Sequence, residues 1–153
     1  MQRNIVNFVV VVLAVLLALF VYDKFRGKPA VEDFGAGELK ARNDMILSDL
    51  NRAMGSAKIA VAEYFFNRAE WPTSNEQAGL PAPDAYKGDS LRKLEVTGNT
   101  LTLTFDEKSG VDGGQIVMVA DGSNPAMGVS WKCTSPNLGF IATVVPACTY
   151  TPR

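Results

Sequence analysis

The chain has 153 residues, of which 47% are hydrophobic and 20% are charged, and its formal net charge at pH 7 is −1. This length suits one domain with an appendage, and the nearly balanced charge gives no support for strong binding to nucleic acid. The chain contains no histidine, which excludes a histidine base and a histidine-ligated metal site.

The first predicted element is an apolar N-terminal helix. Residues 8–22 carry no charge, and their only polar group is the hydroxyl of Tyr22. A helix over residues 5–22, interrupted only by Asn7, would be roughly 27 Å long, which is just enough to cross the hydrocarbon core of a membrane. The segment could be a cleaved secretory signal or a retained anchor. Bulky and charged residues follow at positions 22–26, where a cleavage site needs small ones, so we expect an anchor.

Two observations about the orientation of this anchor disagree. The positive charges in residues 24–28 outnumber those before the segment, which favours a cytoplasmic C-terminus. The two cysteines, Cys133 and Cys148, have the spacing of a structural disulfide, which needs an oxidising compartment; two unpaired buried thiols are the alternative. We give the cysteines more weight and expect residues 38–153 to lie outside the cytoplasm, in a periplasm-like space.

A junction is predicted at residues 23–37, which contain Pro29 and the Gly-Ala-Gly run at 35–37. One long amphipathic helix is then expected over residues 38–70, ended by Pro72. Asp49 and Arg52 are assigned to a more polar side of this helix. Its apolar face recurs at spacings of three and four residues and consists of Ile46, Leu50, Ala53, Ala57, Ala60, Val61 and Tyr64.

The rest of the chain is predicted to form a sheet after a loop at residues 72–90. Gly98-Asn99 is a hairpin signal, and the segment after it alternates strictly between threonine and apolar residues. Strands are expected at 91–96, 100–105, 116–120 and 129–133, with a short fifth one at 140–145 left open. The predicted fold is α+β: a long N-terminal helix, with a transmembrane half and an amphipathic half, packed on an antiparallel sheet of about four strands, with a C-terminal disulfide loop.

Sequence motifs of catalysis are missing. Asp112 and Asp121 lie in glycine-containing turns without the spacing of a calcium loop, so turn formation explains them better than calcium binding. The glycine-rich run at 110–114 precedes a strand rather than a helix, which is not the context of a phosphate-binding loop. We expect no enzyme, no catalytic residue, no cofactor and no metal, and we expect Trp71 and Trp131 to be packing residues.

In this order, the elements resemble a bacterial type IV pilin, and the resemblance covers nearly the whole chain. The stretch 128–133, Gly-Val-Ser-Trp-Lys-Cys, with Cys148 near the end, is similar to the last strand and disulfide-bounded loop of these pilins. Residues 56–65 resemble the exposed half of their long helix.

The resemblance implies a structural protein. Pilins hold their apolar N-terminal helix in the bacterial inner membrane before assembly and pack these helices together in the filament. An apolar cylinder of this kind is well solvated only by lipid or by its own copies. The expected partners are therefore inner-membrane lipid and other pilin subunits, without a small-molecule substrate. The residues that would face them include Phe8, Val12, Leu16, Leu19 and Phe20.

The N-terminus departs from the family pattern. Residues 1–7 have the length of a leader, but Asn7 stands where pilins have the glycine before the cleavage site, and Val12 stands at the glutamate position. We expect this chain to keep residues 1–7 and stay in the membrane, or to enter filaments by a route that does not use that carboxylate. A different native start is the alternative.

Three hypotheses about function follow. The first is a type IV pilin-like structural protein, either a filament subunit or a membrane-anchored accessory, serving adhesion, motility or uptake. The second is a pilin-like receptor for DNA or another ligand, which would need Arg92, Lys93 and Lys132 to converge on one face. The third is an unrelated domain anchored in the membrane and facing the periplasm.

Overall fold

The computed structural model describes residues 31–152. The predicted leader and transmembrane helix, with Phe8, Val12, Leu16, Leu19 and Phe20, lie outside the described residues. Within the described range, no helix combines the length and the apolar character needed to cross a membrane. Lys40–Arg153 forms one compact unit, and the packing below concerns that unit.

The first described element is the long helix α2, Val31–Arg68. It begins earlier than the predicted start at residue 38, and it continues through Gly35 and Gly37. A single glycine costs a helix only about 1 kcal/mol relative to alanine, so two of them are tolerated in a helix of this length. The helix ends where Ala69 takes a left-handed backbone conformation, with φ of 57°, and donates its N–H to the carbonyl of Phe65 at 2.8 Å.

The face of α2 that contacts the sheet agrees closely with the predicted apolar face. Ile46, Leu50, Ala53, Ala57 and Val61 are buried and belong to one hydrophobic cluster with the sheet residues Leu101, Leu103 and Phe105. Ala60 and Tyr64 are half-buried at its margin. Met54 is also buried, and it widens the contact face beyond the prediction.

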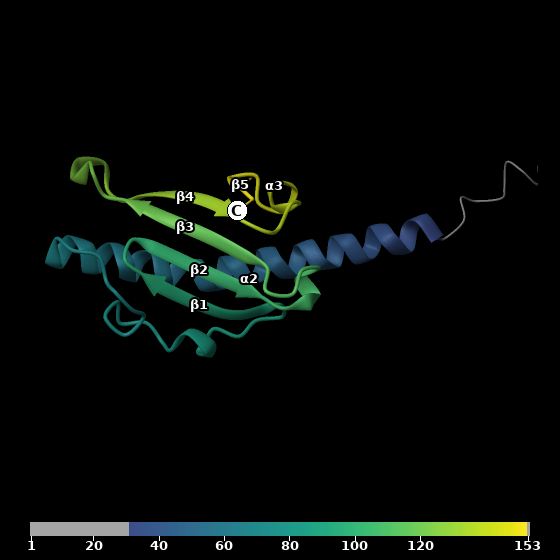
Figure 1. The fold of residues 1–153 in the computed structure, drawn as a ribbon, viewed down its shortest axis with the longest axis horizontal. Coiled ribbons are helices and arrows are strands. Elements are labelled where there is room, and N and C mark those ends of the chain that lie inside the picture. The colour runs from purple at the N-terminus through teal and green to yellow at the C-terminus, as the bar shows by residue number, and fades with distance from the viewer. Residues whose placement is uncertain (1–30, 153) are drawn as a thin grey trace, which may run out of the picture. The chain divides into compact units, whose positions relative to one another are not determined.

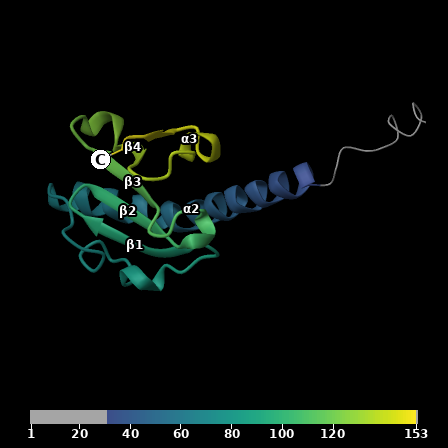
Figure 2. The same ribbon diagram turned by 45° about the vertical axis from the view of Figure 1, so that its right-hand side comes forward.

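The sheet has five strands in the order β1-β2-β3-β4-β5. Figure 1 labels these strands, and Figure 2 shows β1 to β4 side by side from another direction. The first four form an antiparallel meander. The predicted hairpin between the first two is confirmed, and Gly98 supplies the positive φ, 61°, that a two-residue turn requires. The strands are β1 (Leu91–Thr97), β2 (Thr100–Phe105), β3 (Gln115–Asp121), β4 (Ser130–Ser135) and β5 (Cys148–Tyr150).

The fifth strand differs from the prediction in position and direction. Residues 140–145 do not form a strand; they contain the short helix α3, Ile141–Val144. Their apolar run is compatible with either structure, and burial of Ile141 and Val144, three residues apart, fits a helix. Strand β5 follows it and pairs parallel to β4. The sheet is therefore mostly but not wholly antiparallel. Two parallel neighbouring strands need a crossover connection of about a dozen residues, and residues 136–147 form that connection between β4 and β5.

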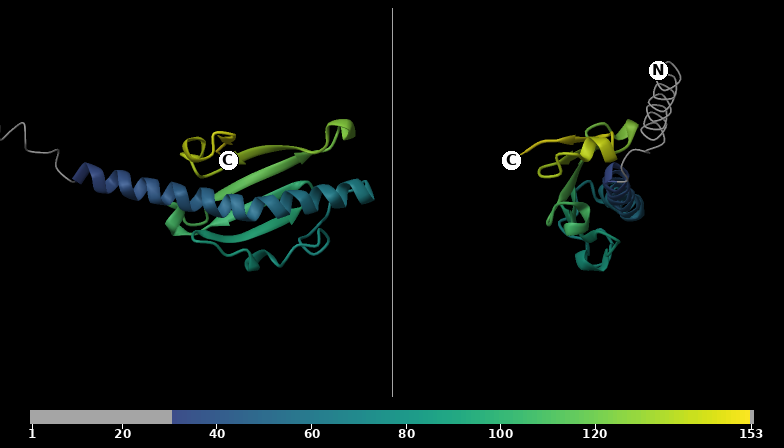
Figure 3. Two further views of the ribbon diagram at one scale, coloured as in Figure 1. Left: turned by 180° about the vertical axis from the view of Figure 1, so that it is seen from behind. Right: turned by 90° about the vertical axis from the view of Figure 1, so that its right-hand side faces the viewer.

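Helix α2 lies across one face of the sheet, as the left panel of Figure 3 shows. Alternation along the strands directs apolar side chains toward the helix and threonines away from it, so Leu101 and Leu103 are fully buried. On β3, Ile116 and Met118 continue the same inner face. The core is thus one layer between helix and sheet, and the C-terminal segment covers its end near β4.

Candidate functional site

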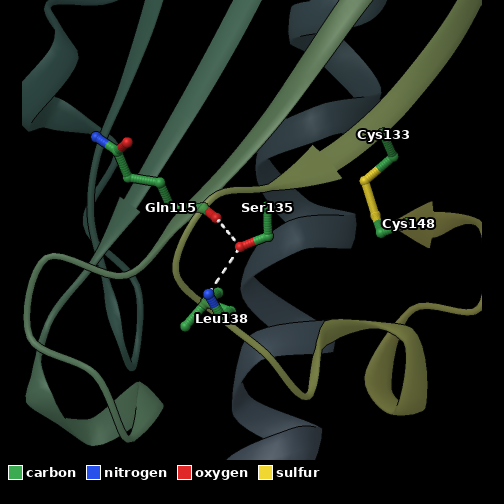
Figure 4. The surroundings of a disulfide bond; sticks show 5 residues. All are labelled: Gln115, Cys133, Ser135, Leu138 and Cys148. Carbon is green, nitrogen blue, oxygen red and sulfur yellow. Dashed lines mark hydrogen bonds between the residues drawn. A yellow bond between two sulfur atoms is a disulfide. The ribbon is translucent and has the colours of Figure 1, made fainter. Parts of the chain in front are cut away.

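The disulfide joins the last two strands. Cys133 on β4 and Cys148 on β5 are bonded, with their Cα atoms 4.5 Å apart (Figure 4). The two residues are also partners in the parallel register, so the covalent bond and the strand pairing specify the same alignment. The predicted pairing is confirmed. In the chain-entropy account, a disulfide with a sequence separation of 15 stabilises the folded state by about 3 kcal/mol, because it restricts the unfolded chain.

A buried serine fixes the start of the disulfide-bounded segment. The hydroxyl of Ser135 donates to the carbonyl of Gln115 at 2.6 Å and accepts from the N–H of Leu138 at 3.0 Å, as Figure 4 shows. The carbonyl of Ser135 accepts from the N–H of Thr151 at 2.9 Å. One residue therefore ties β3, the crossover and the end of β5 together, which makes this edge of the sheet a rigid unit.

The most connected polar residue of the helix is Asp49, which is fully buried. One carboxylate oxygen accepts from the N–H groups of Ser90 and Leu91, at 2.7 and 2.8 Å, and from the Ser90 hydroxyl at 3.0 Å. The other accepts from the N–H of Asp89 at 3.0 Å and pairs with the guanidinium of Arg52. This cluster, which we call the Asp49 clasp, attaches the loop before β1 to the helix.

The assignment of Asp49 to the polar side of the helix was wrong. Asp49 lies three residues after Ile46 and four before Ala53, so the helical period places it inside the apolar stripe. Its charge is tolerated there because several backbone donors converge on it. Burial raises the pKa of Asp49, but the donors at Ser90, Asp89 and Leu91 together outweigh this and hold the pKa below its ordinary value.

A second buried polar residue closes the free edge of the sheet at β1. The amide of Asn75 donates to the carbonyls of Pro81 and Leu94, both at 2.9 Å, and its oxygen accepts from the N–H of Val96 at 2.7 Å. Its side chain therefore imitates a neighbouring strand and occupies edge groups that could otherwise pair with another chain. No sequence signal distinguished Asn75 from the other polar residues of its loop.

Two of the three basic residues proposed for a DNA face, Lys93 and Lys132, lie on the same outer face of the sheet, but they are far apart on it. Lys93 is on β1 and Lys132 on β4, three strand spacings apart, or about 14 Å. Lys93 is paired with Glu95 at 2.7 Å, and Arg92 with Asp112 at 2.7 Å. Their charges are therefore spread over the sheet and partly neutralised.

The remaining candidates have structural surroundings. Asp121 accepts from the N–H of Ser123 at 2.9 Å, as expected for a turn residue. Trp71 stacks on Phe65 with ring centroids 4.1 Å apart, and Trp131 packs against the core. Among the described residues, no group of three or more acidic, cysteine or histidine side chains could hold a metal ion. The arrangement can therefore present a rigid surface, and its best-connected polar groups serve internal attachments.

Comparisons with a family model and with known proteins both find pilins or fimbrial proteins. A family model described as a pilin of bacterial filaments matches residues 47–151. The chain is 32% identical over 85 residues to a fimbrial protein of Neisseria meningitidis serogroup A, covering 52% of this chain and 47% of that protein. It is 33% identical over 84 residues to the type IV major pilin protein PilE1 of Neisseria gonorrhoeae, covering 52% and 49%. The chain thus spans about half the length of the curated relatives it matches.

Proposed function

Because this chain belongs to the pilin family of bacterial filament proteins, we propose that it is a structural subunit of a bacterial type IV pilus system. The observation that carries the proposal is the match over residues 47–151. That range holds most of the helix face, the whole sheet and the disulfide, which are packed as one unit. The similar Neisseria proteins are named as fimbrial protein and major pilin, and we extend that role to this chain.

The proposal includes a membrane anchor. Residues 8–22 would hold the chain in the inner membrane before assembly and would pack against other subunits afterwards, through Phe8, Val12, Leu16, Leu19 and Phe20. Residues 38–153 would lie outside the cytoplasm. The disulfide between Cys133 and Cys148 supports this placement, because such bonds persist in oxidising compartments.

The proposed role is structural and does not include catalysis. Asp49, Asn75 and Ser135 are buried polar residues, and each bonds to backbone groups of another segment of the same chain. They hold the connecting loops in place, so that the outer surfaces keep one shape in every copy. A filament built from repeated contacts needs this uniformity.

The test uses the full chain with an epitope after Arg153, produced in a bacterium that assembles type IV pili. We expect it in the sheared filament fraction. Leu16→Lys should remove it from that fraction, because a charge inside an apolar helix costs at least about 2.5 kcal/mol on insertion scales. Val119→Lys, at a partly exposed position of β3, is the matched control and should leave the amount unchanged.

The same strain distinguishes the competing outcomes. If the chain is found in the inner membrane but is absent from sheared filaments, its role is that of a membrane-resident accessory and not that of a filament subunit. A reporter enzyme that works only in the periplasm, fused after Arg153, should be active. Activity of a cytoplasm-only reporter at the same position would contradict the proposed orientation.

A further inference from the structure

A narrow groove of about 210 Å³ lies between helix α2 and the disulfide-bounded segment. Met54 of the helix and Met118 of β3 line it, together with Val145 after α3 and the bonded pair Cys133 and Cys148. These walls are apolar, and two of them are flexible thioether side chains that adapt to the shape of a bound group. The disulfide holds the wall formed by β5 in place.

The polar groups of the groove come from a single face of the helix. Asn51 and Lys58 also line it, and together with Met54 they follow the helical spacing of three and four residues. Lys58 is half-buried, and no carboxylate of the described residues lies within ion-pair distance of its ammonium. Burial lowers the pKa of Lys58, and its Nζ lies 5.7 Å from the centre of the Trp131 ring.

Together these residues form an apolar slot beside a partly desolvated cation. We propose that the groove binds a small monocarboxylate, whose aliphatic body occupies the apolar walls and whose carboxylate pairs with Lys58. The amide of Asn51 would supply a second hydrogen-bond donor. This inference goes beyond the proposed pilus function and does not depend on it.

The size and charge of the groove narrow the class of ligand. Its volume is smaller than the roughly 300–1,000 Å³ of pockets for drug-sized ligands, so a chain of a few carbons fits and a membrane lipid does not. Among the described residues that line it, Lys58 is the only charged one. A single negative charge would therefore be matched, whereas a second would have no charged partner among the residues that line the groove. A charge-assisted hydrogen bond favours the anion over a neutral molecule of the same shape.

The test uses the full chain in zwitterionic detergent with ¹³C-labelled methionine methyl groups, titrated with pentanoate. Met54 and Met118 report directly on the groove. Met127, which is 84% exposed after β3, reports on non-specific effects. We expect saturable shifts of the Met54 and Met118 signals at millimolar pentanoate and no shift at Met127. Parallel, unsaturated shifts of all three signals would overturn the proposal, and so would the absence of any shift.

Two comparisons test the role of Lys58. Lys58→Gln should raise the dissociation constant about tenfold or more, as loss of a charge-assisted hydrogen bond does. Lys132→Gln, which removes the same charge from an exposed position on β4, is the matched control and should bind as the unmodified chain does. Neutral 1-pentanol should bind the unmodified chain about tenfold more weakly than pentanoate. Equal affinity of Lys58→Gln and Lys132→Gln, with the Met127 signal unchanged in both, would show that Lys58 does not hold the anion and would overturn the proposal.

Discussion

Gly88 faces Asp49 so closely that a β-carbon on Gly88 would lie 1.9 Å from Oδ1 of the Asp49 carboxylate. No real β-carbon approaches an atom at that distance, so any side chain at Gly88 must displace the loop or the carboxylate. The loop before β1 and the Asp49 clasp are therefore built to fit each other. Glycine is needed at position 88 for this close approach and not for an unusual backbone angle, because Gly88 is not among the described glycines with a positive φ.

Gly88→Ala should lower the free energy of unfolding by about 1–3 kcal/mol, the usual cost of overpacking. Gly55→Ala is the matched control, because a β-carbon at Gly55 meets nothing within 4 Å in the middle of α2. That variant should raise the free energy of unfolding by about 0.5–1 kcal/mol through helix propensity. Chemical denaturation of both variants measures the difference, and a similar response from the two glycines would contradict the close approach.

The Asp49 clasp should make stability depend on acid pH. Burial alone would raise the pKa of Asp49, but the amides of Ser90, Asp89 and Leu91 together outweigh it, so the folded-state pKa lies below the ordinary value of 3.8. A depressed pKa contributes stability that is fully present above the unfolded-state value and is lost as the pH falls through the folded-state value. Thermal unfolding should therefore shift to lower temperature below about pH 4.

Asp49→Asn should reduce the fall in unfolding temperature at acid pH. At pH 7 it should lower the free energy of unfolding by about 2–3 kcal/mol, because the donors of the clasp lose a charged acceptor. Asp84→Asn, at an exposed position in the loop, controls for the general effect of removing a carboxylate. If Asp49→Asn and the unmodified chain lose stability equally on acidification, another group must carry the pH dependence.

The end of α2 contains a correctable strain. Ala69 has φ of 57° and is the only non-glycine residue with a positive φ in the described part of the chain. A left-handed conformation costs an L-residue about 1–2 kcal/mol, and glycine avoids this at the price of a more flexible unfolded state. Ala69→Gly should thus raise the free energy of unfolding by a net of about 0.5–1 kcal/mol, measured as a higher midpoint of urea denaturation. A lower midpoint would show that Ala69 is not in this conformation.

Leu50 tests the face that α2 presents to the sheet. It is 7% exposed, so Leu50→Ala should cost about 2–5 kcal/mol, as other buried large-to-small substitutions do. Ile59 lies on the same helix but is 60% exposed, and Ile59→Ala should change stability by less than about 0.5 kcal/mol. Comparable losses at the two positions would mean that the packed face is assigned incorrectly.

Much of this fold could be predicted because its patterns are long. The alternation over Thr100–Phe105 specifies which side chains face the helix, and Gly98-Asn99 specifies the hairpin before it. The helical spacing from Ile46 to Val61 specifies the matching face. In each case, several apolar residues recur at the same spacing, so the period identifies the element and its buried side.

The features that were missed depend on single residues or on very short segments. Strand β5 has three residues, too few for an alternating pattern, and its position follows from the bond to Cys133. Asp49 has the spacing of a buried residue but the charge of an exposed one, and the donors that reconcile the two come from residues 89–91, about forty positions later. Such long-range partners cannot be read from local periodicity.

The last prediction concerns the disulfide as the attachment of β5. This strand is short, it pairs on one side with β4, and the chain reaches it through a crossover that contains only the short helix α3. The covalent bond, the hydrogen bond from Thr151 to Ser135 and the turn bond from Cys148 to Val145, at 2.8 Å, hold it in place.

Reduction of the disulfide should therefore lower global stability by about 3 kcal/mol and release β5 before the rest of the sheet. In hydrogen exchange of the folded, reduced chain, the amides of Cys148 and Thr151 should exchange at least about tenfold faster relative to those of β2 than in the oxidised chain. Cys133→Ser with Cys148→Ser should reproduce this pattern without reductant. If the amides of β2 and β5 accelerate by the same factor, reduction opens the whole sheet at once, and β5 is not a separately attached strand.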